Sequence, residues 1–376
     1  GGVAVKVLEI IPTLDEGGAE KQLCLLAAGL AHQNVDVHVC ALTRLGPRAQ
    51  SLAEAKIPVH EVNKHWKLDI PAYRRLKRLI AELRPDVVHT WLFAANAYGR
   101  QAAIANRTPV IIAGERCVDP WKTWELMIDR RLAKRTDRIA TNSSGVRDFY
   151  VGKGLPKEKF AIIPNAIELE QISVTDEQRD RARREVRQEL GLQQDDKIVI
   201  AVGRLWPQKR YKDLIWAADL LKVVRDDVHF VIVGEGPQRW RLERFRSQVE
   251  IEDRVHLLGH RPDVRRLLAA ANCYWLGSGY EGQSNSLMEA MAMELPVVVS
   301  DIPGNRDLVV DGCHGLLAPP GDGTQFARLT QTLLDDDELS RRLGTAARRR
   351  MAEEFTVDKM VERHLSLYRQ LLEGVG

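Results

Sequence analysis

The sequence predicts an α/β protein in which two doubly wound domains follow one another along the chain. Short apolar runs alternate with longer segments of helical periodicity, a pattern typical of parallel sheets covered by helices. One strongly polar segment interrupts this alternation near the middle of the chain. The length of 376 residues also exceeds the size at which a single hydrophobic core stops growing, so two domains are expected.

The first half begins with an apolar run at residues 3–10, as expected of a strand that is buried on both faces. A helix is expected to follow at residues 20–32. The other elements expected in this half are strands at residues 35–42, 86–89, 109–113, 139–142 and 160–163 and helices at residues 71–83 and 94–105. Their alternation predicts one parallel sheet.

Residues 168–188 contain few large apolar side chains and many Glu, Asp, Arg and Gln, which predicts an exposed linker and helix. A second alternating series follows this segment. Its expected strands lie at residues 197–202, 228–233, 255–258, 273–276, 296–300 and 315–317, and its helices at 212–224, 238–249, 264–271, 286–293 and from 323 onward. The tail at 357–372 has apolar residues at helical spacing and predicts an amphipathic helix.

Composition restricts the possible functions. The chain is 44% hydrophobic and 28% charged with a net charge of +3, values of an ordinary globular protein that argue against nucleic acid as a partner. The five cysteines form no C-x-x-C pair, which predicts neither a zinc site nor a disulfide framework and favours a reducing, cytoplasmic setting. No apolar run approaches the roughly 20 residues that span a bilayer, and no signal peptide is expected.

Two carboxylates, Glu281 and Glu289, are separated by a small polar loop and the start of an apolar helix. A polar loop that leads from a strand into a helix N-terminus is where α/β proteins bind anionic ligands. The segment from Ser286 to Glu289 also fits a capping box, in which Glu289 would only satisfy backbone N–H groups. That alternative does not explain Glu281, which precedes the helix.

Arg204 and Lys209 lie five residues apart around a turn that contains proline, at the end of the strand expected at 197–202. Both cations can converge on one diphosphate, because ligands bind at the ends of such strands. A solvated basic loop is the alternative interpretation. A third motif is Gly17-Gly18 after the first strand, where the backbone can approach a ligand closely. Its spacing does not fit G-x-G-x-x-G, so a nicotinamide cofactor is not indicated.

These three motifs resemble those of glycosyltransferase family 4, the retaining glycosyl transferases of group 1, which move a sugar from a nucleotide-sugar donor. The resemblance is carried by Glu-x7-Glu from Glu281, by Gly-Arg-Leu-x-x-x-Lys from Gly203, and by Gly-Gly-Ala-Glu from Gly17. It covers nearly the whole chain and is strongest over residues 198–214 and 257–318. This chain departs from the family at Arg210, where the family usually has glycine, so a local difference in the backbone is expected.

The resemblance implies a GT-B fold, in which two Rossmann-like domains face each other across a cleft. The first domain, on the acceptor side, comprises residues 1–168 together with a C-terminal helix at 357–376 that crosses back to it. The second domain, on the donor side, comprises residues 169–356.

The resemblance also implies roles for individual residues. Arg204 and Lys209 would stabilise the departing diphosphate, Glu281 would orient the donor sugar, and Glu289 would hydrogen-bond the ribose. Further donor contacts are implied at Gly17, Gly18, His260, Asn285, Ser286 and Leu287. The donor is expected to be a UDP-sugar of a hexose or N-acetylhexosamine, and the acceptor a saccharide or lipid-linked saccharide in the synthesis of cell-envelope polysaccharides or glycoconjugates.

One element of the family pattern is missing. Many relatives have a histidine after the strand expected at 109–113, where this chain has Glu115 and Arg116. Either residue could take that place as a contact for donor or acceptor, and Arg116 is favoured. His89 is another candidate, although a single histidine at a strand end is more often structural. The missing histidine also leaves open an inactive nucleotide-sugar-binding partner subunit, and a nucleotide-sugar epimerase of related fold is the second alternative.

No Asp-x-Asp cluster of the kind that holds a metal and a diphosphate occurs in a suitable loop. The run at residues 335–337 is expected to be a solvated helix start, favoured by the helix dipole. We therefore expect no metal and no cofactor, the nucleotide-sugar being a substrate.

Two stretches of the first domain, residues 73–80 and 121–138, are rich in Arg and Lys with interleaved apolar residues. Together with Trp66, Trp91 and Phe93 they are consistent with a peripheral contact with an anionic membrane on its cytoplasmic face. Ordinary solvated helix faces explain the same pattern, so both interpretations stay open.

Overall fold

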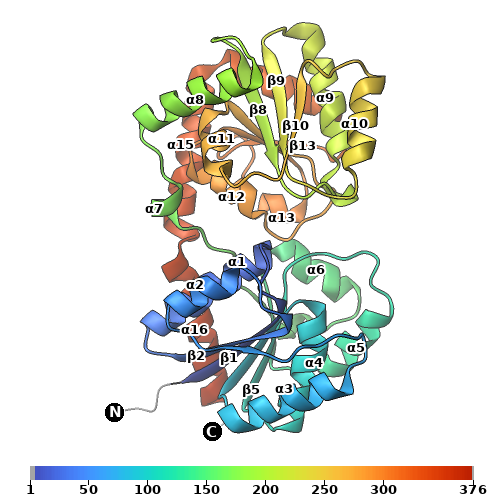
Figure 1. Cartoon of the computed structure of the whole chain (residues 1–376), viewed down its shortest axis with the longest axis vertical. Helices are drawn as coiled ribbons and strands as arrows, with labels where there is room; N and C mark the ends of the chain where they lie inside the picture. The colour runs from blue at the N-terminus through green and yellow to red at the C-terminus, as the bar shows by residue number, and fades with distance from the viewer. Residues whose placement is uncertain (1–4, 375–376) are drawn as a thin grey trace. The chain divides into compact units, whose positions relative to one another are not determined.

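The computed structural model describes residues 5–374 and divides into two compact units (Figure 1). Unit 1 extends to Ala166 and includes the C-terminal segment from Val357, and unit 2 is Ile167–Thr356. The first two residues of the strand expected at 3–10 lie outside the described range.

Among the described residues, unit 1 contains a parallel sheet with the strand order β3-β2-β1-β4-β5-β6-β7. The strands are β1 (Lys6–Thr13), β2 (Asp36–Arg44), β3 (Val59–Glu61), β4 (Val87–Trp91), β5 (Val110–Glu115), β6 (Arg138–Thr141) and β7 (Phe160–Ile162). The helices are α1 (Gly18–His32), α2 (Arg48–Glu54), α3 (Ile70–Leu83), α4 (Leu92–Ala105), α5 (Trp124–Ala133), α6 (Ser144–Gly152) and the C-terminal α16 (Val357–Glu373), with a short 3₁₀ turn η1 (Lys157–Lys159).

The amphipathic tail is confirmed as α16, which packs beside α1 in unit 1. Its residues Met360, Val361 and Tyr368 are buried. The two helices approach closely at Gly29 of α1, because a Cβ added there would lie 2.3 Å from the Val361 Cγ2 atom. The small residue therefore brings the last helix against the first one.

In the described residues of unit 2, the parallel sheet has the order β10-β9-β8-β11-β12-β13. Its strands are β8 (Lys197–Val202), β9 (Val228–Val233), β10 (Val255–Gly259), β11 (Cys273–Leu276), β12 (Val297–Ser300) and β13 (Leu316–Ala318). The helices are α7 (Leu169–Ile172), α8 (Asp176–Leu190), α9 (Tyr211–Val224), α10 (Arg239–Gln248), α11 (Val264–Ala270), α12 (Asn285–Ala292), α13 (Pro303–Arg306), α14 (Gly323–Asp335) and α15 (Asp337–Glu354), with the 3₁₀ turn η2 (Pro207–Lys209).

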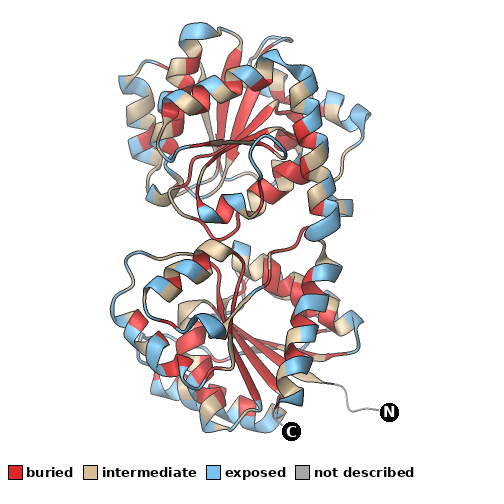
Figure 2. Ribbon diagram, turned by 180° about the vertical axis from the view of Figure 1, so that it is seen from behind, coloured by how far each residue is buried: buried red, intermediate tan, exposed pale blue. Residues whose placement is uncertain are grey.

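Both sheets are doubly wound, as predicted. Figure 2 shows their strands as the buried layer, with exposed residues on the outer faces of the helices. The strand order reverses between β1 and β4 in unit 1 and between β8 and β11 in unit 2. In such sheets ligands bind beyond the carboxyl ends of the strands at this switch point. The loops after these four strands are therefore where a site is expected.

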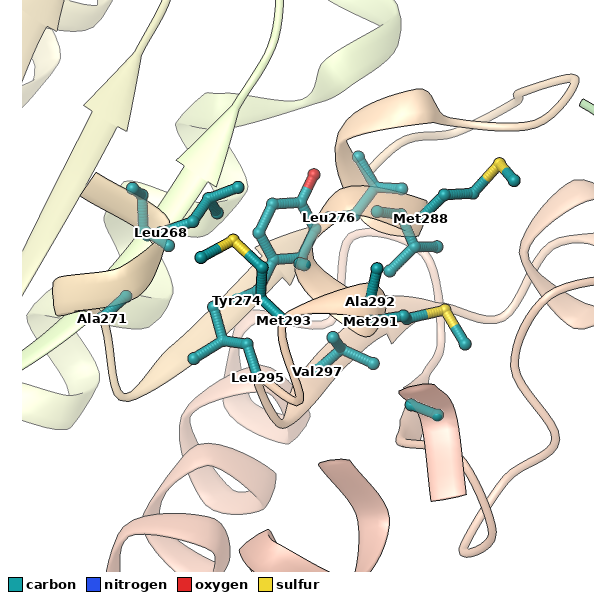
Figure 3. Packing of buried hydrophobic residues seen from close by; sticks show 14 of the residues in the cluster. Leu268, Ala271, Tyr274, Leu276, Met288, Met291, Ala292, Met293, Leu295 and Val297 are labelled. Atoms are coloured by element: carbon teal, nitrogen blue, oxygen red, sulfur yellow. The ribbon is translucent and has the colours of Figure 1, made fainter. Parts of the chain in front are cut away.

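The helix that carries Glu289 is fixed by a dense apolar core. Met288 and Met291 of α12 belong to the same buried cluster as Tyr274, Leu276 and Val297 of the neighbouring strands (Figure 3). These side chains are at most 4% exposed. Burial of each large apolar side chain contributes about 1.5–3 kcal/mol, so the position of α12 on the sheet is strongly determined.

The segment expected as an exposed linker and helix is more ordered than its composition indicated. Within α8, Ala182 and Val186 are buried and the helix packs against α11. Thr175 begins α8 with a capping box, since its hydroxyl accepts from the Gln178 N–H while the Gln178 side chain accepts from the Thr175 N–H. Two small apolar residues and one good cap thus hold a helix that is otherwise polar.

Candidate functional site

The loop after β8 is shaped by glycines at the ends of adjacent strands. Gly234 has φ +141°, and a Cβ added there would lie 2.0 Å from the Gly203 carbonyl oxygen. The Gly203 N–H donates to the Val233 carbonyl at 2.9 Å. The chain segments at Gly203 and Gly234 therefore lie close together. Arg204 follows directly beyond the end of β8, and its side chain is exposed.

Arg204 and Lys209 differ in their surroundings. Within residues 5–374, the Arg204 guanidinium makes neither a hydrogen bond nor an ion pair. Lys209 is the last residue of the 3₁₀ turn η2 and is half-buried, and its Nζ atom lies 2.5 Å from Oε1 of Glu281. One cation of the predicted pair is thus available at the surface, whereas the other is held by a carboxylate.

Glu281 lies in the loop after β11 and is 8% exposed. Its Oε1 atom also accepts a hydrogen bond from the Ser278 hydroxyl at 2.6 Å. The ion pair with Lys209 therefore joins the loops that follow β8 and β11, the two central strands where the order of the sheet reverses. The structure brings together two of the three predicted catalytic residues at the predicted edge of the sheet.

A second layer of polar side chains supports this loop. The Ser300 hydroxyl, at the end of β12, donates to the Ser278 carbonyl at 2.5 Å, and the Asn305 amide donates to the Ser300 carbonyl at 2.9 Å. Ser300 and Asn305 are fully buried. Sequence reasoning missed Ser278, Ser300 and Asn305, because single Ser and Asn residues in loops carry no distinguishing pattern.

The capping-box interpretation of Glu289 is wrong. The N-cap of α12 is Ser284, two residues before the N-cap that this interpretation requires, and its hydroxyl accepts from the Leu287 N–H at 3.4 Å. Ser286 lies inside the helix, and its hydroxyl donates to the Val202 carbonyl at 2.9 Å and lies 2.8 Å from the Tyr274 hydroxyl. Glu289 is in the second turn and half-buried, so it is not a capping residue.

Both carboxylates influence the same tyrosine. Burial raises the pKa of Tyr274, and the charges of Glu281 and Glu289 raise it further, against the hydrogen bond with Ser286. Tyr274 therefore stays protonated, with its hydroxyl against that of Ser286. Asn285, the first residue of α12, is half-buried, and Leu287 is fully buried.

The backbone at Arg210 adopts the conformation that glycine favours. Arg210 has φ 53° and ψ 36°, in the left-handed region, where it ends the turn η2 and precedes α9. The expected difference in the backbone is thus not observed. The guanidinium lies against Gly321, where an added Cβ would lie 2.2 Å from Nη2, and its Nε atom donates to Asp213 at 2.6 Å.

The predicted donor contacts at His260 and at Gly17-Gly18 have different surroundings. His260 is exposed and follows β10, two strands away from β8 in the sheet. Gly17 is the N-cap of α1, with Gly18 as the first helical residue. A Cβ added at Gly17 would lie 2.0 Å from Oε2 of Glu20, so the Glu20 carboxylate folds over this helix start. A carboxylate in the first turn already interacts favourably with the helix dipole there.

In unit 1, a buried polar network joins β1, β4 and α16. Glu9 of β1 accepts hydrogen bonds from the Trp91 indole at 2.6 Å and from the Tyr368 hydroxyl at 3.0 Å. His89 Nδ1 lies 2.8 Å from the Tyr368 oxygen and 3.2 Å from Glu9 Oε2. Because Tyr368 donates its only proton to Glu9, its oxygen can only accept from His89, so we place a proton on Nδ1 of His89.

Glu115 and Arg116, at the end of β5, enter different networks. The Glu115 carboxylate accepts from Asn96, Lys122 and Tyr150 at 2.9–3.2 Å, so these donors fix it in place. The Arg116 guanidinium carbon lies 3.9 Å from the centroid of the Trp91 ring. All three of its nitrogens are buried and have no hydrogen-bond partner among the described residues.

Burial lowers the pKa of Arg116 to about 10, and the charges of Glu9 and Tyr368 oppose this shift. The same environment lowers the pKa of His364 on α16 well below its usual value, by burial first and then by His89 and Arg116. Arg116 is therefore a buried cation without hydrogen-bond acceptors of its own. Trp91 is fully buried, so the prediction that it contributes to a membrane contact is wrong.

Two family models together span most of the chain. The model described as Glycosyltransferase Family 4 matches residues 16–171, and that described as Glycosyl transferases group 1 matches residues 182–350. The chain belongs to glycosyltransferase family 4.

Curated relatives of this glycosyltransferase are named for related activities. It is 27% identical over 319 residues to the Escherichia coli UDP-Gal:alpha-D-GlcNAc-diphosphoundecaprenol alpha-1,3-galactosyltransferase, covering 80% of this chain and 79% of the relative. It is 26% identical over 359 residues to a Campylobacter jejuni 4-alpha-N-acetylgalactosaminyltransferase named for a diphospho-undecaprenol substrate, covering 90% and 93%.

Solved structures show that the glycosyltransferase has the GT-B fold. Anabaena HepE, solved in complex with UDP and glucose, superposes with a TM-score of 0.87 at 21% identity, covering 97% of this chain and 100% of that one. Sucrose-phosphate synthase from Thermosynechococcus elongatus superposes with a TM-score of 0.80 at 21% identity, covering 98% and 100%. Within residues 5–374 of the glycosyltransferase, no helix combines the length and the apolar character needed to cross a bilayer.

Proposed function

We propose that the protein transfers a hexose or N-acetylhexosamine, with retention of configuration, from a UDP-sugar to a saccharide or lipid-linked saccharide in cell-envelope polysaccharide or glycoconjugate synthesis. The observation that carries this proposal is the ion pair between Lys209 and Glu281 at the switch point of unit 2, with the Arg204 side chain unpaired beside the same strand end. The E. coli relative, named for UDP-Gal and an alpha-1,3 product, supports the choice of nucleotide and an α linkage.

Charge explains how these residues would act. As the glycosidic bond to the donor breaks, negative charge grows on the leaving diphosphate. Arg204 and Lys209 would bind that charge, and one well-placed donor of this kind is worth about 100- to 1000-fold in rate. Glu281, held by Ser278, would orient the donor sugar, and Glu289 would anchor the ribose.

The reaction balances without an additional base. The bond from the anomeric carbon to the diphosphate oxygen breaks, and a bond from that carbon to the acceptor oxygen forms on the same face of the sugar. The acceptor proton passes to the departing phosphate oxygen. The proposal uses no metal and no cofactor, because the two cationic side chains neutralise the leaving group.

On the acceptor side, the proposal assigns contacts to unit 1. Arg116 is the strongest candidate, since its buried guanidinium has no hydrogen-bond acceptor among residues 5–374 and an anionic or hydroxyl-bearing ligand would supply one. His89 and Glu115 have internal partners and would act mainly by holding their neighbours. Names that include diphosphoundecaprenol among the relatives support a lipid-linked acceptor at an anionic membrane.

A thermal-shift panel tests the donor site. UDP, GDP, ADP and their common sugars are compared on the wild type, on Arg204→Ala and on the control Arg341→Ala, which removes an exposed arginine of α15. A ligand at about 100 times its Kd adds roughly 2.7 kcal/mol of stability. We expect a shift with uridine ligands that is lost in Arg204→Ala and kept in Arg341→Ala.

Absence of a shift with every nucleotide would overturn the proposal. A shift with GDP or ADP ligands alone would overturn the choice of UDP. The anomeric configuration of the product, measured by the proton coupling in its NMR spectrum, tests retention. A product of inverted configuration would contradict the proposed mechanism.

A further inference from the structure

Large apolar side chains are exposed on two segments of unit 1. Trp66, Leu68 and Ile70, in and after the loop that follows β3, are 73%, 90% and 64% exposed. Trp121 and Met127, before and within α5, are 83% and 69% exposed. Most single exposed apolar residues need no explanation, but a cluster of them on adjacent segments marks a binding surface.

The two segments enclose an apolar groove of about 490 Å³. Leu68 contributes one wall, and Trp124 of α5 contributes the other. The rings of Trp124 and Phe93 meet edge to face with their centroids 5.5 Å apart. The remaining lining residues are Lys64, Lys67, Ala94, Ala97, Tyr98, Gln101, Glu125 and Ile128.

Residues of α4 form the floor of the groove. This helix packs against both α3 and α5, which lie on either side of it (Figure 1). Small residues of the floor, Ala94 and Ala97, leave space that larger side chains would fill. Two further hollows of about 230 and 400 Å³ share Gln101 with the groove, and one of them also shares Leu68. The three hollows therefore adjoin one another around Gln101 of α4.

The surroundings of the groove are basic. The segment 64–84 has seven Lys and Arg residues against two acidic ones, and 121–138 has six against three. Lys64 lies over the Tyr98 ring at 5.1 Å from its centroid, at one wall of the groove, and Lys67 is exposed beside it. Exposed tryptophans flanked by basic residues are typical of a surface that contacts anionic lipid.

The groove also lies at the ligand-binding edge of the sheet. Of its lining residues, Lys64 follows β3, Phe93 follows β4 and Trp124 follows β5, so the groove opens beyond the carboxyl ends of these strands. Gly17 after β1 and Arg116 after β5 lie at the same edge. A ligand in the groove would thus have one end at the edge of the sheet where the acceptor contacts are proposed.

We propose that this groove binds the hydrocarbon chain of a phosphate-bearing membrane lipid, with Lys64 and Lys67 on the phosphate. An apolar groove with cations at its wall matches a long chain that ends in an anion, whereas a polar saccharide would leave the apolar walls unsatisfied. This inference rests on the proposed lipid-linked acceptor and identifies where its lipid part binds.

Calorimetric titration with farnesyl phosphate, below its aggregation concentration, tests the inference on the full chain. In Ala94→Phe the added ring fills the floor of the groove, and we expect binding at least about 10-fold weaker than in the wild type, a loss of roughly 1.4 kcal/mol. Leu68→Ser changes a residue that is 90% exposed, so it leaves the fold intact while it removes one wall. We expect a similar loss.

Three controls test whether binding of farnesyl phosphate depends on the groove itself, rather than on nonspecific apolar contact or on charge alone. Trp240→Ser removes a tryptophan of unit 2 that is 58% exposed and should bind farnesyl phosphate like the wild type. Lys64→Gln combined with Lys67→Gln should weaken farnesyl phosphate several-fold and leave farnesol binding unchanged. Inorganic phosphate alone should not bind measurably.

Each variant is also tested for its thermal shift with UDP, so that the two proposals can fail separately. If Ala94→Phe and Leu68→Ser bind farnesyl phosphate as tightly as the wild type does, the proposal of a lipid-binding groove is overturned, whatever the UDP result. The same holds if the wild type does not bind farnesyl phosphate but keeps its UDP shift. Loss of the UDP shift in the wild type, with lipid binding intact, would instead overturn the donor proposal.

Discussion

The hydroxyl of Tyr368 donates a hydrogen bond to Oε1 of Glu9 at 3.0 Å, although the two residues are 359 positions apart. Glu9 lies on β1 at the switch point of the first sheet, and Tyr368 lies on the last helix. Both residues are fully buried, and the second oxygen of Glu9 accepts from Trp91. This bond therefore fixes α16 to the strand beside which acceptor contacts are proposed.

Tyr368→Phe should destabilise unit 1 by about 1–3 kcal/mol, because it leaves a buried carboxylate oxygen and His89 Nδ1 without this partner. Hydrogen exchange of the amides in α16 measures the effect locally, which avoids treating a chain of two units as a single transition. Tyr73→Phe, on the half-buried face of α3, removes a hydroxyl of the same kind as a control. Equal protection of α16 in Tyr368→Phe and the wild type would contradict the prediction.

The central strands could be predicted from the sequence to the residue. Lys197–Val202, Val228–Val233 and Cys273–Leu276 have the expected bounds, because strands buried on both faces are apolar at nearly every position. Short elements at the edges were missed. Helix α2 has one fully buried side chain, Leu52, and the edge strand β3 has only half-buried or exposed ones, so neither carries a readable pattern.

The sequence was sufficient to predict which residues belong to the site, but not which contacts they make with one another. Lys209 and Glu281 were each expected, yet their contact joins positions 72 residues apart and depends on β8 and β11 being neighbours. The capping box in the sequence placed the N-cap of α12 at Ser286, two residues after the observed N-cap Ser284, which produced the wrong interpretation of Glu289. Glu9 was missed because a single acidic residue in an apolar strand shows no partner until the sheet and α16 are assembled.

Lys209→Met should lower kcat by about 100- to 1000-fold if Lys209 stabilises the departing diphosphate. The unbranched apolar side chain of methionine keeps most of the packing, and Glu281 retains its bond from Ser278, so the loop after β11 should stay folded. Steady-state kinetics with the donor identified by thermal shift measures the effect. Lys212→Met, which changes an exposed lysine in the first turn of α9, is the matched control. A loss shared by both variants would contradict a specific role.

Glu281→Gln should separate sugar binding from nucleotide binding. The amide keeps an oxygen for the Ser278 hydroxyl but loses the charge that pairs with Lys209. We expect UDP to bind at least as well as in the wild type, because Lys209 is released for the diphosphate, whereas transfer from the UDP-sugar falls. Calorimetry with UDP and kinetics with the sugar donor measure the two effects. Weaker binding of UDP itself would show that Glu281 acts on the nucleotide.

Arg210→Gly should be more stable than Arg210→Ala by about 1 kcal/mol, since a left-handed backbone conformation costs L-residues roughly that amount. Both variants lose the partly exposed ion pair with Asp213, which contributes little, so the comparison isolates the backbone. Thermal unfolding of the two variants side by side checks the prediction. An alanine variant as stable as the glycine variant would show that this turn changes its conformation when the arginine is removed.

The histidine pair between β9 and β10 should make unit 2 less stable in mild acid. His229 Nδ1 lies 3.2 Å from His256 Nε2, and burial, with His229 and Arg246 as additional causes, lowers the pKa of His256 to about 4. Below pH 6.5 the unfolded chain therefore binds a proton that the folded chain does not. The contribution is complete above pH 6.5 and is lost as the pH falls towards 4, by roughly 1–3 kcal/mol.

His256→Gln removes this proton uptake, so its unfolding midpoint in urea should fall less between pH 7 and pH 4.5 than that of the wild type. His32→Gln, which changes an exposed histidine at the end of α1, should keep the slope of the wild type. Many carboxylates contribute to acid unfolding, and they contribute equally to all three proteins, so only the difference between the slopes is used. If the slope for His256→Gln equals that of the wild type, His256 is already protonated in the folded protein or is hydrated there, and the histidine pair does not limit stability in acid.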